Sequence, residues 1–379
     1  MPAGIDEIYD LTTERIKQHP RESLARRALS WIVYATRPLR VEEVQHAIAI
    51  DDLEPEDRSI AKDFLTPEAL IVDACAGLIK IDEKSNIIGL VHKTAQEYFD
   101  RKGATHLPDA QLHIGTRCLK YLSLDVFRDG CCPTDDLFAS RLRENKLLDY
   151  AAQNVANHVR EETMRELRDL VLKFLMDTRK VSCATQVLFV TRTGWRSEGI
   201  SQWYPRDFFG IHYAAHFGWT EILRCLIENS EADVDLKDSY GRTALSWAAE
   251  NGHEGVVKLL IVEGKADVNL KDDGGRTALS RAAVNGHKGV VQQLIVGNAE
   301  VDLEDSFGQT ALSWAAENGQ EGVVQLLMVE GKANVDLADG FGQTALSWAV
   351  DNGHEGVVKL LQSTTTASSR FALHPVNRF

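Results

Sequence analysis

The sequence predicts a mainly α-helical protein in which an α-solenoid of short repeats follows a winged-helix unit and a helical connector. Two observations lead to this prediction. The C-terminal part of the chain repeats itself every 33 or 34 residues, which is typical of stacked two-helix units. The N-terminal part shows three amphipathic helical segments and then an alternating pattern typical of a β-hairpin.

The 379 residues are too many for one small domain and suit two or three. We expect five segments: 1–21, the end of a preceding helical module; 22–101, the winged helix; 102–204, the helical connector; 205–362, about five repeats with the first degenerate; and 363–379, a flexible tail.

The winged-helix prediction depends on the order of its elements. SLARRALSWIVYAT and VEEVQHAIAI read as two amphipathic helices, and Thr66-Pro67-Glu68 is expected to cap a third helix that runs to Cys75. LIKIDE and NIIGLVH then alternate around a turn at residues 84–86, and KTAQEYFD closes the unit as a helix. Three helices with a two-stranded wing are the expected result.

Each C-terminal repeat is expected to contain two helices and a return loop. In the copy GRTALSWAAENGHEGVVKLL, Thr243 is a natural cap for a short first helix. Gly252 stops that helix because glycine tolerates a positive φ. Residues 256–260 supply the apolar side of a second helix. One such pair cannot bury its own apolar side, so the copies are expected to stack into one continuous core.

The repeated unit resembles the ankyrin repeat, whose first helix opens with Thr-Pro-Leu-His and whose loop reads Gly-Ala-Asp-Val-Asn. The resemblance covers about 155 residues and implies a protein-binding array. Two positions depart from the family pattern, because alanine stands in place of the proline and serine in place of the histidine in four copies: Ala244, Ala278, Ala311 and Ala345, with Ser246, Ser280, Ser313 and Ser347. Losing the histidine is expected to remove a hydrogen-bonding partner of the cap.

One equivalent position carries a ladder of large side chains along the first helices: Tyr213, Trp247, Arg281, Trp314 and Trp348. Aromatic and arginine side chains dominate interface hot spots, so the ladder is a candidate binding stripe, with packing between repeats as the alternative. A charged head is rarely buried without a partner. We therefore expect the neighbours of Arg281 in this ladder to be at least partly exposed.

The tips of the turns and the ends of the first helices form a second candidate surface. Tip residues vary between copies while the helices barely change, either because they contact a partner or by drift. In ankyrin proteins these positions commonly contact partners, so the resemblance implies the following contact residues: Tyr240, Arg242, Glu250, Asn251, Arg276, Phe307, Gln309, Glu317, Phe341, Gln343 and Asp351.

His253, His287 and His354 also recur at one position, and Gln320 interrupts this series. Helices of neighbouring repeats are about 10 Å apart, so the three imidazoles cannot bind one metal ion. A structural role is expected for them.

The chain is acidic, with 42 Lys and Arg against 56 Asp and Glu and a net charge of −14. Residues 206–362 contain 12 basic and 24 acidic side chains, which gives −12. Such an array repels phosphate backbones, so no nucleic-acid partner is expected. Its charge suits a positively charged protein partner, or it merely confers solubility.

Several other functions are not expected. The six cysteines lack the spacing of a zinc site or a disulfide framework, and the sequence shows no cofactor motif. No stretch reaches the roughly 18 apolar residues of a membrane span, so a cytoplasmic or nuclear protein is expected.

The N-terminal half resembles a second family. LSWIVYATRPLRVEEVQHAIAI and GLVHKTAQEYF look like the winged-helix unit that follows the NACHT module in fungal NACHT–ankyrin proteins, which are STAND or NLR-like signalling proteins. CLKYLSLDVF and LLDYAAQNVANH resemble the connector of that family. The chain itself contains no Gly-x-x-x-x-Gly-Lys-[Ser/Thr] phosphate loop and no Gly-x-Ser-x-Gly elbow.

The resemblance therefore implies a non-catalytic sensor or adaptor that binds protein through its repeats. The alternative is the regulatory part of a nucleotide-dependent signalling ATPase whose NACHT module is absent from this chain. A hydrolase is the third hypothesis.

Overall fold

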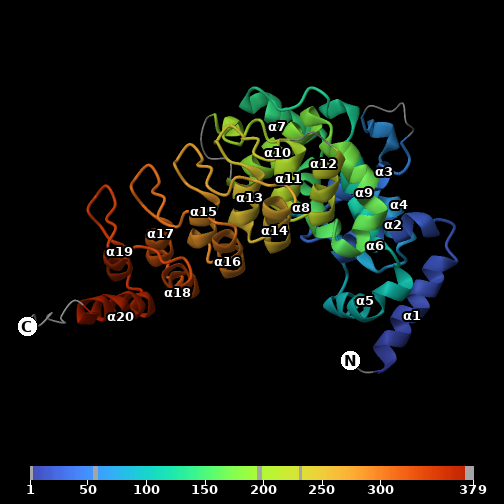
Figure 1. Ribbon diagram of the computed structural model, residues 1–379. Coiled ribbons are helices and arrows are strands. Elements are labelled where there is room, and N and C mark those ends of the chain that lie inside the picture. The colour runs from blue at the N-terminus through green and yellow to red at the C-terminus, as the bar shows by residue number, and fades with distance from the viewer. Residues whose placement is uncertain (1–2, 54–58, 194–198, 230–232, 372–379) are drawn as a thin grey trace, which may run out of the picture. The chain divides into compact units, whose positions relative to one another are not determined.

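The structure is a computed structural model that describes residues 3–53, 59–193, 199–229 and 233–371. The chain divides into two compact units, Met1–Tyr204 and Pro205–Phe379. Both units are mostly helical (Figure 1), so the predicted fold class is confirmed.

The first unit begins with a winged helix. Its strands form one antiparallel sheet in the order β1-β3-β2, in which Leu39 pairs with Ile88 and Ile79 with Leu90. The elements are α1 (Ala3–Lys17), α2 (Glu22–Tyr34), β1 (Leu39–Arg40), α3 (Val41–Ala49), η1 (Lys62–Phe64), α4 (Glu68–Ala74), β2 (Ile79–Asp82), β3 (Ile87–Leu90) and α5 (Lys93–His106). The predicted two-stranded wing is present, and β1 adds a third strand to it. Two residues are too few to show a period-two pattern in a sequence.

The predicted cap of the third helix is wrong in detail. Helix α4 begins at Glu68, but its N-cap residue is Pro67 and no side chain caps it. Thr66 instead contributes its backbone carbonyl, which accepts a hydrogen bond of 2.8 Å from Gln45 Nε2. The Thr66 carbonyl therefore links α4 to α3, and the first N–H groups of α4 have no side-chain acceptor.

The helical connector completes the first unit. It contains α6 (Ala110–Leu122), η2 (Asp125–Phe127), α7 (Asp135–Glu144), α8 (Leu148–His158), α9 (Glu161–Leu175), α10 (Thr178–Thr193) and η3 (Ile200–Gln202). Helix α6 packs against α2, α8 and α9. Buried polar groups join the connector to the winged helix: Tyr121 Oη lies 2.9 Å from His46 Nδ1, and Tyr150 Oη accepts from the Thr36 N–H at 3.0 Å.

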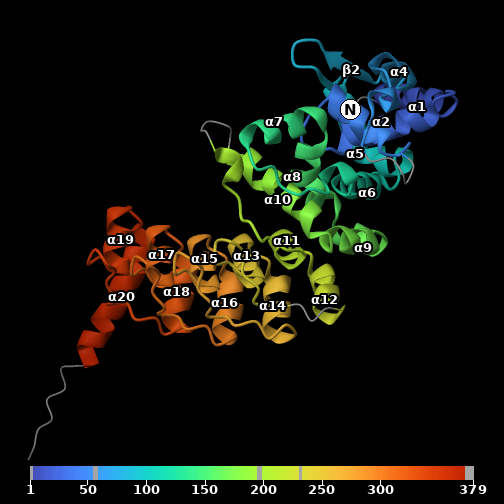
Figure 2. The ribbon, with the colours of Figure 1, turned by 90° about the horizontal axis from the view of Figure 1, so that it is seen from above.

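The second unit is a stack of five helix pairs within the described residues. The pairs are α11 (Gly210–Phe217) with α12 (Thr220–Asn229), α13 (Ala244–Asn251) with α14 (Glu254–Val262), α15 (Ala278–Val284) with α16 (Lys288–Val296), α17 (Ala311–Glu317) with α18 (Glu321–Val329), and α19 (Ala345–Asp351) with α20 (Glu355–Phe371). In Figure 2 the first helices form one row and the second helices another. Helix α20 extends to Phe371 because no glycine or proline interrupts it after Gly356, so the segment expected to be a flexible tail is helical as far as that residue. Residues 372–379 lie outside the described residues.

Local signals set the ends of the first helices as predicted. The Thr243 hydroxyl accepts from the Ser246 N–H at the start of α13. The same cap occurs at the equivalent threonines of the next three repeats: Thr277, Thr310 and Thr344. Gly252 ends α13 with φ at +77°. Each repeat therefore encodes its own short first helix.

The recurrent histidines connect successive repeats. His253 Nε2 lies 2.9 Å from the carbonyl oxygen of His216 in the preceding repeat, and His287 Nε2 lies 3.0 Å from that of Glu250. Gln320 makes the equivalent bond from Nε2 to the Val284 carbonyl at 3.2 Å. The predicted structural role of these side chains is confirmed, since they saturate carbonyls at the ends of the preceding first helices.

The expected loss of a capping partner is only partly correct. In the degenerate first repeat, His212 accepts from the Phe209 N–H at 3.1 Å and also lies 2.9 Å from the Leu236 carbonyl. Serine keeps the first bond in the third and fifth repeats, where Ser280 Oγ accepts from the Thr277 N–H at 2.9 Å and Ser347 Oγ accepts from the Thr344 N–H at 2.7 Å. A serine side chain is too short to reach the next loop, so the second bond is lost.

Candidate functional site

A buried aspartate anchors the tip of each turn. Asp305 Oδ1 accepts from the N–H groups of Phe307 at 2.9 Å and Gln309 at 3.0 Å. Asp238, Asp272 and Asp339 make the equivalent pair of bonds in their own repeats. These aspartates were not among the residues predicted from the sequence. Their recurrence at the same place in every copy was the available signal.

Neighbouring tips are joined through their backbones. The Asp273 N–H donates to the Tyr240 carbonyl at 3.0 Å, and the Gly340 N–H donates to the Phe307 carbonyl at 2.8 Å. Ser306 makes the corresponding bond to Gly274 at 3.0 Å. The four tips thus form one hydrogen-bonded strip, which holds their side chains in a fixed row.

The ladder of large side chains ties each first helix to its own tip. Trp247 Nε1 donates to Asp238 Oδ2 at 2.9 Å, and Trp314 Nε1 donates to Asp305 Oδ2 at 3.0 Å. Trp348 makes the same bond to the aspartate of the last repeat at 2.9 Å. A buried indole needs such a partner for its N–H. The ladder therefore has a structural role within each repeat that carries a tryptophan.

Exposure along the ladder differs from the expectation. Tyr213 is fully buried and Trp247 is 3% exposed, whereas Trp314 and Trp348 are half-buried. Partial exposure was thus correctly predicted for the last two residues and wrongly for the first two. The first repeats surround their ladder side chains with other rings, such as Phe208 at 5.3 Å from Trp247.

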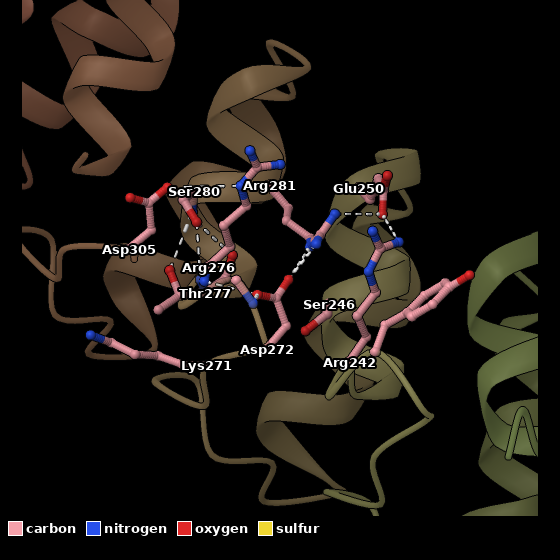
Figure 3. A network of polar contacts seen from close by, with 12 residues as sticks. Arg242, Ser246, Glu250, Lys271, Asp272, Arg276, Thr277, Ser280, Arg281 and Asp305 are labelled. Carbon is pink, nitrogen blue, oxygen red and sulfur yellow. Dashed lines mark hydrogen bonds and ion pairs between the residues drawn. The ribbon is translucent and has the colours of Figure 1, made fainter. Parts of the chain in front are cut away.

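Arg281 is buried as an ion pair, which corrects the inference that was drawn from its charge. Its Nε donates to Asp272 Oδ2 at 3.0 Å, its Nη2 donates to the same oxygen, and its Nη1 lies 3.2 Å from Glu250 Oε2 (Figure 3). The guanidinium occupies the place of an indole and uses the same aspartate as partner. Two carboxylates allow the charge to be buried. The exposure of the neighbouring ladder side chains therefore cannot be inferred from the charge of Arg281.

A second set of bonds joins the last tip residue of a repeat to the residue eight positions later. Arg242 Nη1 donates to Glu250 Oε2 at 3.0 Å. Gln309 donates to Glu317 at 3.0 Å, and Gln343 donates to Asp351 at 3.2 Å. We call each of these pairs a rung. In the third repeat, the residue eight positions after Arg276 is Val284, whose side chain cannot accept a hydrogen bond.

Electrostatics and stacking hold the tip arginines in place. Arg242 lies over the rings of Trp247 at 4.6 Å and Tyr240 at 5.6 Å, and Arg276 lies over Trp314 at 4.2 Å. Burial, followed by the nearby charge of Arg281, lowers the pKa of Arg242. Arginine still stays charged at any physiological pH.

The candidate contact residues gather on the tips and first helices, but not all reach the surface. Three tip rings are exposed: Tyr240 by 39%, Phe307 by 55% and Phe341 by 76%. Asn251 and Asp351 are exposed as well, and together these five residues define the tip face. Seven further candidates are half-buried: Arg242, Glu250, Arg276, Trp314, Glu317, Gln343 and Trp348. The other four are buried: Tyr213, Trp247, Arg281 and Gln309. Gln309 directs its amide to its rung partner Glu317.

A second exposed row lies on the other side of the repeats. Val262, Val296 and Val329 end the second helices α14, α16 and α18, and they are 59%, 73% and 68% exposed. This row was not predicted from the sequence, although the same residue recurs there in three copies. It is a smaller apolar surface than the aromatic rings provide.

Other kinds of site are not seen in the part of the chain that the structure describes. No group of three His, Cys, Asp or Glu side chains there is placed to hold a metal ion. No helix among the same residues has the length and apolar character needed to cross a bilayer.

Comparison with known families agrees with this geometry. A family model of ankyrin repeats, with three copies, matches residues 205–272 and 279–369. The second unit is an ankyrin-repeat array. A model described as the winged helix domain of GPI inositol-deacylase matches residues 11–106. No curated protein matches the chain. Ankyrin repeats imply protein partners, so the array has the character of a protein-binding module.

Proposed function

We propose that this chain is a non-catalytic adaptor or sensor that binds a protein partner through the tip face of its ankyrin array. The observation that carries the proposal is the row of exposed rings at Tyr240, Phe307 and Phe341. Large aromatic side chains that are exposed to solvent on a protein surface are typical of interface hot spots. Because the aspartate anchors and the bonds between tips fix the backbone beneath them, little ordering is required on binding.

Site-specific photo-crosslinking tests this proposal. A photoreactive phenylalanine analogue replaces Phe341 in one variant of the full chain and Val329 in another, since both positions are similarly exposed on opposite rows. The Phe341 variant should form a discrete crosslinked product in cells. Replacing Tyr240 and Phe307 by alanine in the same variant should remove that product. A product that forms only from Val329, or that survives both alanine substitutions, would place binding elsewhere.

The charge of the array supports a positively charged partner. The 24 acidic and 12 basic side chains of residues 206–362 produce a negative field that attracts a basic protein and accelerates its association. The same charge disfavours nucleic acids, because their phosphates would be repelled. We place the protein in the cytoplasm or nucleus.

A second candidate is the regulatory part of an NLR-like signalling ATPase that acts with a NACHT module outside this chain. The order of winged helix, helical connector and ankyrin array favours it, since that order resembles fungal NACHT–ankyrin proteins. Equilibrium binding of labelled ATP to the full chain separates the two candidates. The adaptor proposal predicts no binding at micromolar concentrations, whereas saturable binding would favour the second.

We do not propose a hydrolase. The match to the deacylase family covers its winged helix domain only, and the sequence contains no Gly-x-Ser-x-Gly elbow. No cofactor belongs to the proposed function.

A further inference from the structure

The third repeat differs from its neighbours at three positions that lie together. Arg281 replaces the ladder tryptophan, Gly274 replaces the tip ring, and Val284 replaces the carboxylate of the rung. The second, fourth and fifth repeats keep an aromatic tip residue, a tryptophan and a complete rung. The three substitutions lie in one region of the array, so together they change both the shape and the charge of the surface there.

The missing rung leaves Arg276 without a matched carboxylate. Its guanidinium forms a long ion pair with Asp305, whose Oδ2 lies 3.8 Å from Arg276 Nε. That oxygen already accepts from Trp314 Nε1, and Asp305 Oδ1 accepts two backbone N–H groups. The Arg276 side chain is 31% exposed. A guanidinium presents a planar set of donors that fits a carboxylate.

The other two arginines of this region are already neutralised. Glu250 accepts from both Arg242 and Arg281, and Asp272 pairs with Arg281 (Figure 3). Arg276 has only a longer contact, of 3.8 Å to Asp305, so it is the arginine of this cluster best placed to take a further carboxylate.

The missing tip ring opens a hollow beside Arg276. The hollow has a volume of about 270 Å³ and lies between Tyr240 and Phe307, with Gly274 at the place of the missing ring. Its charged lining consists of three arginines and two aspartates, Arg242, Arg276, Arg281, Asp272 and Asp273, so the basic side chains are in excess by one. Stacking on Trp314 at 4.2 Å holds the Arg276 guanidinium in place. The space accommodates one side chain with an aliphatic stem and a polar end.

We propose that this hollow binds an acidic side chain, Asp or Glu, of the protein partner. The carboxylate of the partner pairs with Arg276 and replaces the group that Val284 does not supply. The stem of that side chain packs between the rings of Tyr240 and Phe307. The inference rests on the proposed function, because it specifies what one part of the tip face recognises. The rest of the array is acidic, so a single acidic residue within a basic segment is the chemistry that fits both features.

A constrained loop-peptide library displayed on phage and panned against the full chain tests the proposal. The matched variant is Val284→Glu, which restores the rung within the chain, since Glu250 and Glu317 occupy the same position in neighbouring repeats. Enriched peptides should share one Asp or Glu at a fixed position. Replacing that residue by Asn or Gln should weaken binding to the wild-type chain at least tenfold.

Against Val284→Glu the same peptides should bind at least tenfold more weakly, and their acidic and amide forms should then bind equally. Arg276→Gln should give the same result, since glutamine stands at this position in two other repeats. The proposal is wrong if enriched peptides share no acidic residue, or if Val284→Glu binds them as tightly as the wild type. In those cases weakening by Phe307→Ala would show that the tip face still binds protein. Peptides that are indifferent to Phe307→Ala and Phe341→Ala would overturn the proposed function itself.

Discussion

Replacing Asp305 by alanine should destabilise the fourth repeat strongly. Asp305 is 8% exposed and accepts three hydrogen bonds, from the backbone of Phe307 and Gln309 and from the indole of Trp314. A hydrogen bond to a charged group contributes about 1.5–3 kcal/mol, and a buried donor left alone costs about 1–3 kcal/mol. Phe307 and Trp314 are partly exposed, so water replaces some of the lost bonding. We expect the free energy of unfolding of this region to fall by about 3 kcal/mol.

Asp302→Ala is the matched control. Asp302 is exposed in the return loop of the same region and accepts one bond, from the Asn334 N–H at 3.0 Å, so its loss should cost less than about 1 kcal/mol. The loss of stability in Asp305→Asn should fall between those of the two alanine variants. The asparagine keeps an oxygen for the two backbone N–H groups, but it places an NH2 group opposite the indole N–H, where neither group can accept. Repeat arrays open in parts, so hydrogen exchange of peptides covering residues 305–318 is the appropriate measurement. Equal exchange in Asp305→Ala and Asp302→Ala would refute the anchoring role.

Three further predictions concern the stack and its charge. Gly252→Ala should lower the free energy of unfolding by at least about 1 kcal/mol more than Gly353→Ala does. Both glycines have a positive φ, so the strain of an alanine there is shared. A Cβ on Gly252 would lie 2.7 Å from His287 Nδ1, whereas a Cβ on Gly353 would meet no atom within 4 Å. Equal melting temperatures would mean that the repeats do not interlock there. Burial, partly opposed by a hydrogen bond to the backbone, lowers the pKa of His253 in the folded state. The unfolded chain therefore binds the proton first, so stability is complete above about pH 6.5 and falls below it. His253→Gln, which copies Gln320, should lose less stability between pH 7.5 and pH 5.5, and an unchanged loss would contradict this. The association rate with a partner should fall as salt rises from about 50 to 500 mM, because the Debye length shrinks severalfold. A rate indifferent to salt would contradict electrostatic attraction.

The features predicted correctly are those that neighbouring residues decide. Thr243 caps a helix through its hydroxyl group, and Gly252 ends that helix because glycine tolerates a positive φ. The helices of a repeat could therefore be predicted from a segment of about 20 residues. The hairpin of β2 and β3 followed from alternation around its turn in the same way.

The features that were missed or wrong depend on distant partners. The burial of Arg281 is possible because Asp272 and Glu250 lie beside it, and Glu250 comes from another repeat. β1 exists only through its pairing with β3. The tip aspartates recur in the sequence. Their role as hydrogen-bond acceptors could not be predicted, because the sequence does not show which indole N–H each carboxylate faces. Site residues therefore depend on the three-dimensional structure even when the fold class does not.

The most direct test of the binding function is a hydrogen-exchange footprint of the full chain, with and without the partner captured by the Phe341 crosslink. Amides of the tips and first helices, in residues 238–251, 272–284, 305–318 and 339–352, should exchange more slowly in the complex, and those of α14, α16 and α18 should be unchanged. Slower exchange confined to the second helices around Val296 would contradict binding through the tip face.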